Sequence, residues 1–260
     1  MGWRYCVSNV DRALRVSSEL FLSPTWPAPK QIKAFVSTRI GGVSESPFDA
    51  LNLGAHVGDN IEHVNENRRL FALATSMPDS VQWLNQVHGV TVAHLPFDSD
   101  IESADAAFTQ QKNQVCAILT ADCLPVFFCD ETGQNVAVAH AGWRSLCAGV
   151  LEETLACFDA PEKVMVWLGP GIGANAFEVG GEVREAFVAV QSQAELAFKA
   201  KENGKWLGDL YLIAKQRLAA KGVVQIYGGD HCTFSESSLF YSFRRDGQTG
   251  RMASVIWFET

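Results

Sequence analysis

The stretch ILTADCLPVFFCD, residues 118–130, places one cysteine between two apolar runs. Both runs have the length and composition of buried β-strands, and Asp122 and Pro125 bracket the thiol between them. We therefore expect one strand to stop, Cys123 to be presented at a turn, and a second strand to begin. Three interpretations of this cysteine stay open: a small buried residue, a metal ligand, or a nucleophile paired with His140 and oriented by Asp122.

The rest of the chain alternates between predicted strands and predicted helices. Apolar residues at helical spacing predict helices over 64–77, 144–158, 182–190 and 208–222. Short apolar runs predict strands over 32–37, 115–120, 126–130, 135–140, 163–169, 223–229 and 253–258, and residues 81–95 predict a strand, a tight turn at Gly89 and a strand. Hairpins are mixed with strand–helix alternation, so we expect one α+β domain with mixed sheets rather than a doubly wound parallel sheet.

Composition excludes several classes of protein. Hydrophobic residues make up 47% of the 260 residues, which predicts a sizeable core, and the formal net charge is -8 without a dense basic run, which argues against nucleic acid as a partner. We find no apolar run of bilayer length and no signal peptide, so we expect no membrane association. The seven cysteines are scattered without a CxxC pair, which favours reduced thiols and a cytoplasmic protein over a disulfide framework.

Three residues occupy positions where a predicted strand gives way to a turn. These are His88 in NQVHG, Cys123 in TADCLP and His140 in AVAHAGWR. Functional residues gather at such positions on a rigid scaffold. Two imidazoles and a thiolate form a suitable ligand set for Zn²⁺, with a fourth position left for water or substrate. Spacing alone does not decide between a zinc site, a metal-free Cys–His pair and ordinary packing roles, because no short-range pair such as HxxxH is present.

Several arginines are candidates for recognising an anionic substrate. Arg39 lies in the long Gly-rich stretch 38–60, Arg144 begins a predicted helix, and Arg244 and Arg245 lie in FRRDGQTGR. The aromatic rings of Trp143 and Phe243 could stack on a planar ligand. With two polar residues added, the predicted substrate-binding set is Arg39, Asn52, Gln86, Arg144, Arg244 and Arg245.

Six motifs in order along the chain carry a resemblance to a known family. They are STRIGGVS with NLGAHVGDN, WLNQVHG, LTADCLPVFF, VAVAHAGWRS, WLGPGIG with FEVG, and FYSFRRDGQTGR. Together they resemble the YfiH/YlmD family of laccase-domain, or multicopper polyphenol oxidase-like, proteins over roughly residues 30 to 258. One departure is Ser145, where the family usually has glycine after HAGWR.

The resemblance implies a single domain over residues 1–260 and a metal site formed by His88, Cys123 and His140. Zinc is the implied metal, and copper is also associated with the family. The implied reactions are phosphorolysis of adenosine, methylthioadenosine, inosine and guanosine, and deamination of adenosine. In this reading the predicted catalytic residues are His88, Cys123, His140, Asp122 and Arg39, and the partners are small molecules.

Alternative functions remain open from the sequence. The family is also named for a peptidoglycan editing factor, which implies a hydrolase that removes L-serine from a UDP-linked muramyl-peptide precursor. Copper-dependent oxidation of polyphenols at one bound ion is a further alternative. A true multicopper laccase needs about ten histidines and this chain has six, so that design is excluded. A fourth protein ligand, such as His56 or His231, would instead indicate a closed structural zinc site.

Overall fold

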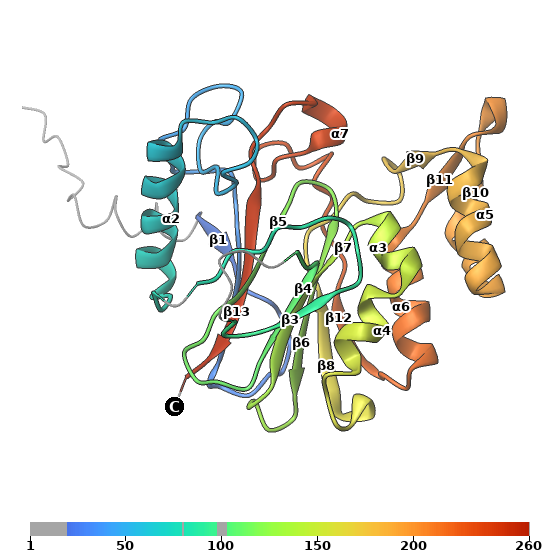
Figure 1. The fold of residues 1–260 in the computed structure, drawn as a ribbon. Helices are drawn as coiled ribbons and strands as arrows, with labels where there is room; N and C mark the ends of the chain where they lie inside the picture. Colours follow the sequence, from blue (N-terminus) through green and yellow to red (C-terminus); the bar gives the residue numbers. More distant parts are fainter. Residues whose placement is uncertain (1–19, 80, 98–102, 260) are drawn as a thin grey trace, which may run out of the picture.

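The computed structural model describes residues 20–79, 81–97 and 103–259, and Figure 1 shows their arrangement. The predicted absence of a signal peptide concerns residues that lie outside this described part. The strands are β1 (Phe21–Leu22), β2 (Ile32–Ser37), β3 (Val92–His94), β4 (Ala106–Thr109), β5 (Cys116–Thr120), β6 (Leu124–Asp130), β7 (Val136–Ala141), β8 (Val164–Leu168), β9 (Glu178–Val179), β10 (Phe198–Ala200), β11 (Trp206–Gly208), β12 (Gln225–Gly228) and β13 (Met252–Phe258). The α-helices are α2 (Ile61–Thr75), α3 (Trp143–Ala148), α4 (Val150–Leu155), α5 (Gly181–Val190), α6 (Leu210–Ala220) and α7 (Phe243–Asp246).

Two sheets pack against each other through a shared apolar core. One has the strand order β1-β2-β13-β5, and the other has the order β12-β8-β6-β7-β4-β3. Most neighbouring strands are antiparallel, whereas β12 with β8 and β3 with β4 are parallel. A third, small sheet of β10, β11 and β9 lies beside α5 (Figure 1). The mixed pairing confirms the predicted α+β class.

The stretch that holds Cys123 carries the chain from one of these sheets to the other. β5 pairs with β13 in the first sheet, and β6 pairs with β7 and β8 in the second. Only residues 121–123 separate the two strands. The predicted interruption between two buried strands is therefore a crossing between sheets, and the thiol lies at that crossing.

β6 is buried on both faces, which explains its unbroken apolar run. Phe127 and Cys129 point into the core between the two sheets. Leu124, Val126 and Phe128 point the other way, toward the helices. Successive side chains of β6 thus pack into two separate cores. Packing on both faces of β6 fixes the position of the crossing at residues 121–123.

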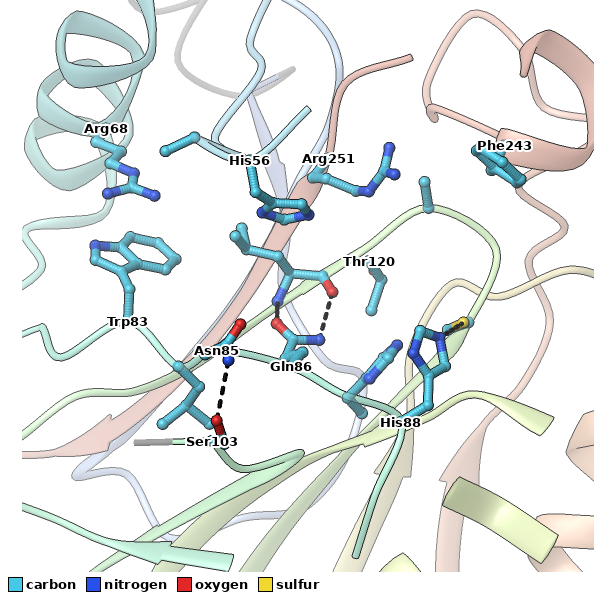
Figure 2. A pocket seen from close by; sticks show the side chains of 16 residues that line it. His56, Arg68, Trp83, Asn85, Gln86, His88, Ser103, Thr120, Phe243 and Arg251 are labelled. Atoms are coloured by element: carbon cyan, nitrogen blue, oxygen red, sulfur yellow. Dashed lines mark hydrogen bonds between the residues drawn. The ribbon is translucent and has the colours of Figure 1, made fainter. Parts of the chain in front are cut away.

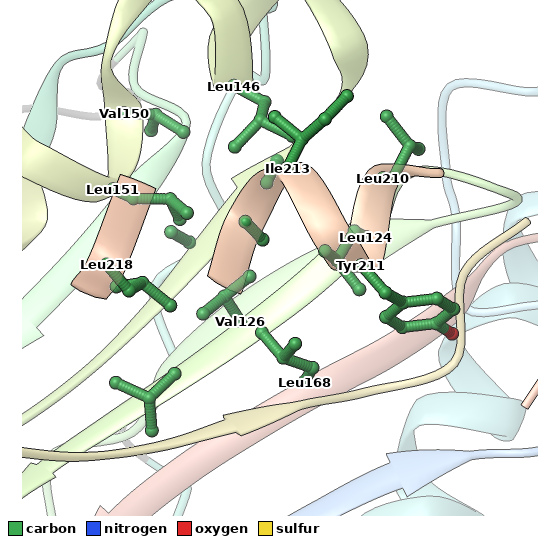
Figure 3. Close-up of a cluster of buried hydrophobic side chains, with 14 of the residues drawn as sticks. Leu124, Val126, Leu146, Val150, Leu151, Leu168, Leu210, Tyr211, Ile213 and Leu218 are labelled. Carbon is green, nitrogen blue, oxygen red and sulfur yellow. The ribbon is translucent and has the colours of Figure 1, made fainter. Parts of the chain in front are cut away.

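Helices cover the outer faces of both sheets. α2 covers the first sheet, where Phe71 packs with Val255 and Trp257 of β13. α3, α4 and α6 cover the second sheet (Figure 1). Figure 3 shows leucine, isoleucine and valine side chains of these helices against β6 and β8. None of the described helices is long and apolar enough to span a membrane.

Two local predictions are wrong. The helix expected over 144–158 is divided into α3 and α4, because Gly149 takes a left-handed conformation with φ 111° and ends the first helix. The first arm of the strand pair expected over 81–95 forms only isolated bridges at Val81 and Asn85. Its residues instead form a loop along a cavity, and only β3 is a strand.

Candidate functional site

The structure brings His88, Cys123 and His140 together, with their ligand atoms within 4.8 Å of one another. The sulfur of Cys123 lies 3.9 Å from Nε2 of His88 (Figure 2). The rings of His88 and His140 meet edge to face with their centroids 4.8 Å apart. His140 in β7 is buried, Cys123 is half-buried and His88 is exposed, so the cluster is anchored in the sheet and open on one side.

Asp105, immediately before β4, holds two of these three residues. Its carboxylate accepts the backbone N–H groups of Val87, His88 and Gly89, at 3.2, 2.9 and 2.6 Å. These bonds hold His88 in the left-handed region with φ 59°, a conformation that few residues other than glycine adopt. The loop geometry that presents the His88 imidazole therefore depends on a carboxylate distant in the sequence.

The same carboxylate orients the ring of His140. Nδ1 of His140 donates a hydrogen bond to Oδ1 of Asp105 over 2.8 Å, and the backbone N–H of His140 donates to the carbonyl of Asp105 over 2.7 Å. Asp105 is fully buried. With Nδ1 engaged in this way, Nε2 of His140 is the nitrogen left to bind a metal, as is usual for histidine ligands backed by a carboxylate.

The Cys123 thiol and the buried His140 imidazole shift each other's pKa in opposite directions. Burial opposes ionisation of Cys123, but the charges and hydrogen bonds of His140 and His88 lower its pKa to about 6. Burial likewise opposes protonation of His140, but the Cys123 thiolate and the Asp105 hydrogen bond raise its pKa to about 9. Both shifts favour the thiolate of Cys123 together with the imidazolium of His140, and a metal ion competes with the proton for the His140 ring.

The donor set fits a single Zn²⁺. Two ligand atoms that share one zinc ion lie within about 4.4 Å of each other, from bond lengths near 2.1 Å for nitrogen and 2.3 Å for sulfur. The separation of 3.9 Å between Cys123 and His88 satisfies that limit. The three ligand atoms are spread over up to 4.8 Å, so the group must draw slightly closer together to share one ion. Three protein ligands with one exposed side also correspond to a catalytic rather than a closed structural site.

No fourth protein ligand joins the cluster among the described residues. His56 lines the same cavity but is not part of the group. His231 lines a different cavity, where its Nδ1 is bonded to Glu236 over 2.9 Å. Neither histidine therefore supports the closed-site alternative.

Asp122, a predicted catalytic residue, anchors the crossing that presents Cys123. Its backbone is left-handed, with φ 87°. Its Oδ1 accepts the hydroxyl of Thr233 over 2.6 Å, and its Oδ2 accepts the backbone N–H of Arg244 over 2.7 Å. Both oxygens are thus engaged in positioning the loop, and a role in proton transfer stays a prediction.

Gly142 leaves the space that the ligands occupy. A Cβ at this position would lie 2.9 Å from Cδ2 of His88 and 3.0 Å from the Cys123 sulfur. Its backbone, with φ -62° and ψ 158°, suits any residue, so alanine would act on the ligands alone. We expect Gly142→Ala to weaken zinc binding about tenfold or more in a chelator competition titration.

The control for this variant is Gly181→Ala at the start of α5, where the nearest atom to an added Cβ is 3.8 Å away. That substitution should leave zinc affinity unchanged. Wild-type zinc affinity in Gly142→Ala would mean that the metal is not held between His88 and Cys123.

The metal-binding cluster forms part of the wall of an open cavity of about 1040 Å³, shown in Figure 2. The loop 83–88, the end of β5 and Arg251, which immediately precedes β13, contribute much of the wall. The polar and aromatic side chains around it are His56, Arg68, Trp83, Asn85, Gln86, Ser103, Thr120, Phe243 and Arg251.

Gln86 is the one predicted substrate-binding residue that lines this cavity. Its side-chain amide donates to the carbonyl of Leu119 and accepts the backbone N–H of the same residue, at 2.8 and 2.7 Å. The amide thus ties the loop 83–88 to β5. Asn52 is fully buried and bonds Asp59 and the backbone N–H of Arg251, so it positions neighbouring segments.

The predicted arginines do not line the cavity. Arg39 donates to the carbonyl of Asp49 and lies over the ring of Tyr241. Arg144 is exposed, and its guanidinium lies over the ring of the adjacent Trp143. The other two make hydrogen bonds to backbone carbonyls, from Arg244 to Glu178 and from Arg245 to Thr233, Phe234 and Phe240.

Sequence reasoning missed four residues of the site: Asp105, which is buried behind the ligands, and Arg68, Trp83 and Arg251 in the cavity wall. Arg68 lies on the amphipathic helix α2, and Arg251 ends the motif FRRDGQTGR. Arg251 belongs to the motif FRRDGQTGR, but the prediction took Arg244 and Arg245 of that motif as the substrate-binding residues. Nothing local marks Asp105, since its partners are 16 to 35 residues away.

Comparisons with known proteins agree with this fold. A family model described as multi-copper polyphenol oxidoreductase laccase matches residues 33–259. The chain is 57% identical to the Escherichia coli protein named purine nucleoside phosphorylase YfiH, over 90% of this chain and 97% of that protein. It is 51% identical to a Pseudomonas aeruginosa protein also named a purine nucleoside phosphorylase, over 92% of this chain and 98% of that protein.

Solved structures show the same fold. A crystal structure of a Neisseria meningitidis protein superposes with a TM-score of 0.88 at 46% identity, over 93% of this chain and all of that one. The crystal structure of YlmD from Geobacillus stearothermophilus superposes with a TM-score of 0.83 at 30% identity, again over 93% of this chain and all of that one.

Proposed function

Because this chain belongs to the multi-copper polyphenol oxidoreductase laccase family, in which similar proteins are named purine nucleoside phosphorylases, we propose that it is a metal-dependent purine nucleoside phosphorylase. The carrying observation is that the His88–Cys123–His140 cluster opens into a cavity with aromatic and cationic side chains in its wall. The flat base of a nucleoside can stack on the aromatic side chains, and the negative charge of phosphate can pair with the cationic ones.

The reaction transfers a ribosyl group to phosphate. An oxygen of phosphate forms a bond to C1′ of the ribose, and the bond from C1′ to the purine nitrogen breaks with its electron pair going to the base. The products are ribose 1-phosphate and the free purine, which gains a proton. A bound Zn²⁺ would supply Lewis acidity in this cavity.

The side chains of the protein position the metal ligands and the substrate. His88, Cys123 and His140 would hold the metal, and Asp105 bonds the backbone of His88 and the ring of His140. Phe243 on α7 is 58% exposed and lines the cavity, so its ring can stack on a base beside the Arg251 guanidinium, which lies 5.9 Å from the ring centre. Gln86 fixes the loop that carries His88 to β5.

The test is a substrate panel on protein whose metal content has been measured. We expect bound zinc at about one ion per chain, and release of free purine from inosine, guanosine, adenosine or methylthioadenosine only when phosphate is present. Chelation should abolish this activity, and zinc should restore it. Full phosphorolysis by metal-free protein would contradict the metal-dependent reaction.

The same panel separates the other reactions. Conversion of adenosine to inosine without phosphate would indicate deamination. Release of L-serine from a muramyl-peptide precursor, with no release of purine, would favour the editing hydrolase. Oxidation of a polyphenol by copper-loaded protein alone would favour the oxidase, and in either of the last two outcomes the phosphorylase assignment fails.

A further inference from the structure

Two arginines in the cavity wall form no ion pair among the residues that the structure describes. Arg68 and Arg251 are partly buried, yet neither has a carboxylate within ion-pair distance among the residues that the structure describes. Arg144 and Arg244 also lack one, but they are exposed to solvent. Burial lowers the pKa of both guanidinium groups, and for Arg251 the charges of Cys123 and Asp122 offset part of this effect. A bound anion would offset the cost of burial further.

Both guanidinium groups are held in place by other contacts. Arg68 donates from Nε to the carbonyl of Leu53 over 3.0 Å and lies 4.2 Å from the centre of the Trp83 ring. Arg251 donates from Nη1 to the carbonyls of Thr249 and Gly250, at 2.8 and 3.0 Å. In the described part of the chain, no acceptor is recorded for the two Nη groups of Arg68 or for Nε and Nη2 of Arg251. These donors are therefore oriented and available.

His56 shares the electrostatic environment of the two arginines. Burial lowers the pKa of its imidazole, and the positive charges of Arg251 and then Arg68 lower it further. Two cations thus act on one ring beside the cavity, although the whole chain carries a net charge of -8. Figure 2 shows His56, Arg68 and Arg251 along one side of the cavity and His88 on the other.

We propose that Arg68, Arg251 and His56 form the phosphate-binding end of this cavity. The inference rests on the proposed phosphorylase function and names the residues that receive its second substrate. Phosphate would accept hydrogen bonds from the available guanidinium donors, which suit its oxygens better than the exposed, stacked Arg144 does. The nucleoside would then lie between these residues and the metal ligands.

Arginine-to-glutamine variants test the inference through the kinetics of each substrate. Arg68→Gln and Arg251→Gln should each raise KM for phosphate by about tenfold to a hundredfold, because each loses charge-assisted hydrogen bonds. KM for the nucleoside and the bound zinc should change by less than about twofold, since the remaining contacts are intact. Arg68→Lys and Arg251→Lys, which keep the charge, should recover part of the loss.

The matched control is Arg184→Gln. Arg184 also lies over a tryptophan, 4.6 Å from the ring centre of Trp206, but it pairs with Glu195 and does not line the cavity. Its substitution should leave KM for phosphate unchanged. Far-UV circular dichroism and thermal unfolding show whether each variant is folded before its kinetics are compared.

Calorimetric titration of zinc-loaded protein with inorganic phosphate separates this inference from the function on which it rests. Phosphorolysis with an unchanged KM for phosphate in both glutamine variants would overturn the inference and leave the function standing. If wild-type protein releases no purine, the function fails, and loss of phosphate binding in the variants would still support the site. Absence of phosphate binding by the wild-type protein would overturn the site.

Discussion

Cys123→Ala is expected to abolish zinc binding and phosphorolysis while the protein stays folded. The variant removes the only thiolate of the cluster and leaves two imidazoles, one of them exposed. Changes behind a metal ligand cost about ten- to a hundredfold in affinity or activity, so loss of a ligand itself should exceed that range. Metal analysis and the substrate panel measure both effects on the same preparation.

The matched control is Cys157→Ala. Cys157 is also a partly buried thiol beside a histidine, with its sulfur 3.7 Å from Nε2 of His94, but this pair lies outside the cavity. Its removal should leave zinc content and purine release at wild-type levels. Wild-type zinc content in Cys123→Ala would contradict the metal assignment.

The same variant changes the titration of His140. The charge of the Cys123 thiolate is the largest effect that raises the pKa of this imidazole to about 9. In metal-free Cys123→Ala, the pKa of His140 should therefore fall, and NMR titration of the ring protons measures it. An unchanged titration would mean that the two groups do not share a proton.

A nucleophilic role for Cys123 predicts a different result. The metal-free wild-type protein would then be active, and Cys123→Ala would abolish that activity.

The ligand set comes from the resemblance carried by the ordered motifs, because the spacing of His88, Cys123 and His140 alone leaves packing roles and a metal-free Cys–His pair open. The structure brings the three side chains together as a group that could hold a metal ion, although His88 lies in a loop rather than at the end of a strand. The separation of β5 and β6 into different sheets is not predictable in the same way. Both strands are continuous apolar runs in the sequence. Such runs are compatible with two paired strands of one sheet and with two strands in sheets that pack face to face.

The wall of the cavity is harder to predict than the ligands. Arginines in FRRD and in the Gly-rich loop looked like anion-binding residues, but their donors are used by backbone carbonyls. Arg68 has the sequence signature of an ordinary surface residue of α2. What distinguishes it is the missing carboxylate partner and the contact with Trp83, and both are properties of the folded chain.

Asp105→Asn is expected to weaken zinc binding by about ten- to a hundredfold, since Asp105 orients two ligands at once. Four donors converge on its carboxylate. Oδ1 accepts the backbone N–H of His88 and Nδ1 of His140, and Oδ2 accepts the N–H groups of Val87 and Gly89. An amide has one oxygen and one NH₂ group, so either orientation of asparagine sets its NH₂ against N–H donors of the loop.

The consequence for each orientation can be stated. If the amide oxygen stays on His88 and His140, the NH₂ group faces the N–H groups of Val87 and Gly89 and the loop loses its anchor. If the amide is flipped, its NH₂ group can donate to Nδ1 of His140 only when that ring carries its proton on Nε2, the nitrogen that must bind the metal. Both outcomes reduce affinity, through His88 in the first and through His140 in the second.

The absorption spectrum of bound Co²⁺ reports on the metal ligands themselves, and a general loss of stability would not change it. Co²⁺ bound to a thiolate and two imidazoles should give a charge-transfer band from Cys123 and visible bands typical of four-coordination. In Asp105→Asn we expect the Co²⁺ titration to shift to higher concentrations and the visible bands to change, because one imidazole is lost or displaced. Chelator competition then gives the zinc affinity of the same variant.

Asp130→Asn is the matched control. Asp130 likewise accepts four hydrogen bonds, from the backbone N–H groups of Gln134 and Asn135 and from the side chains of Thr132 and Asn135. It lies at the far end of β6 from the Cys123 crossing. Asp130→Asn should lower thermal stability while its cobalt spectrum and zinc affinity match the wild type. If Asp105→Asn behaves in the same way, the carboxylate is a structural residue of the loop, and the orientation of both histidines must come from packing alone.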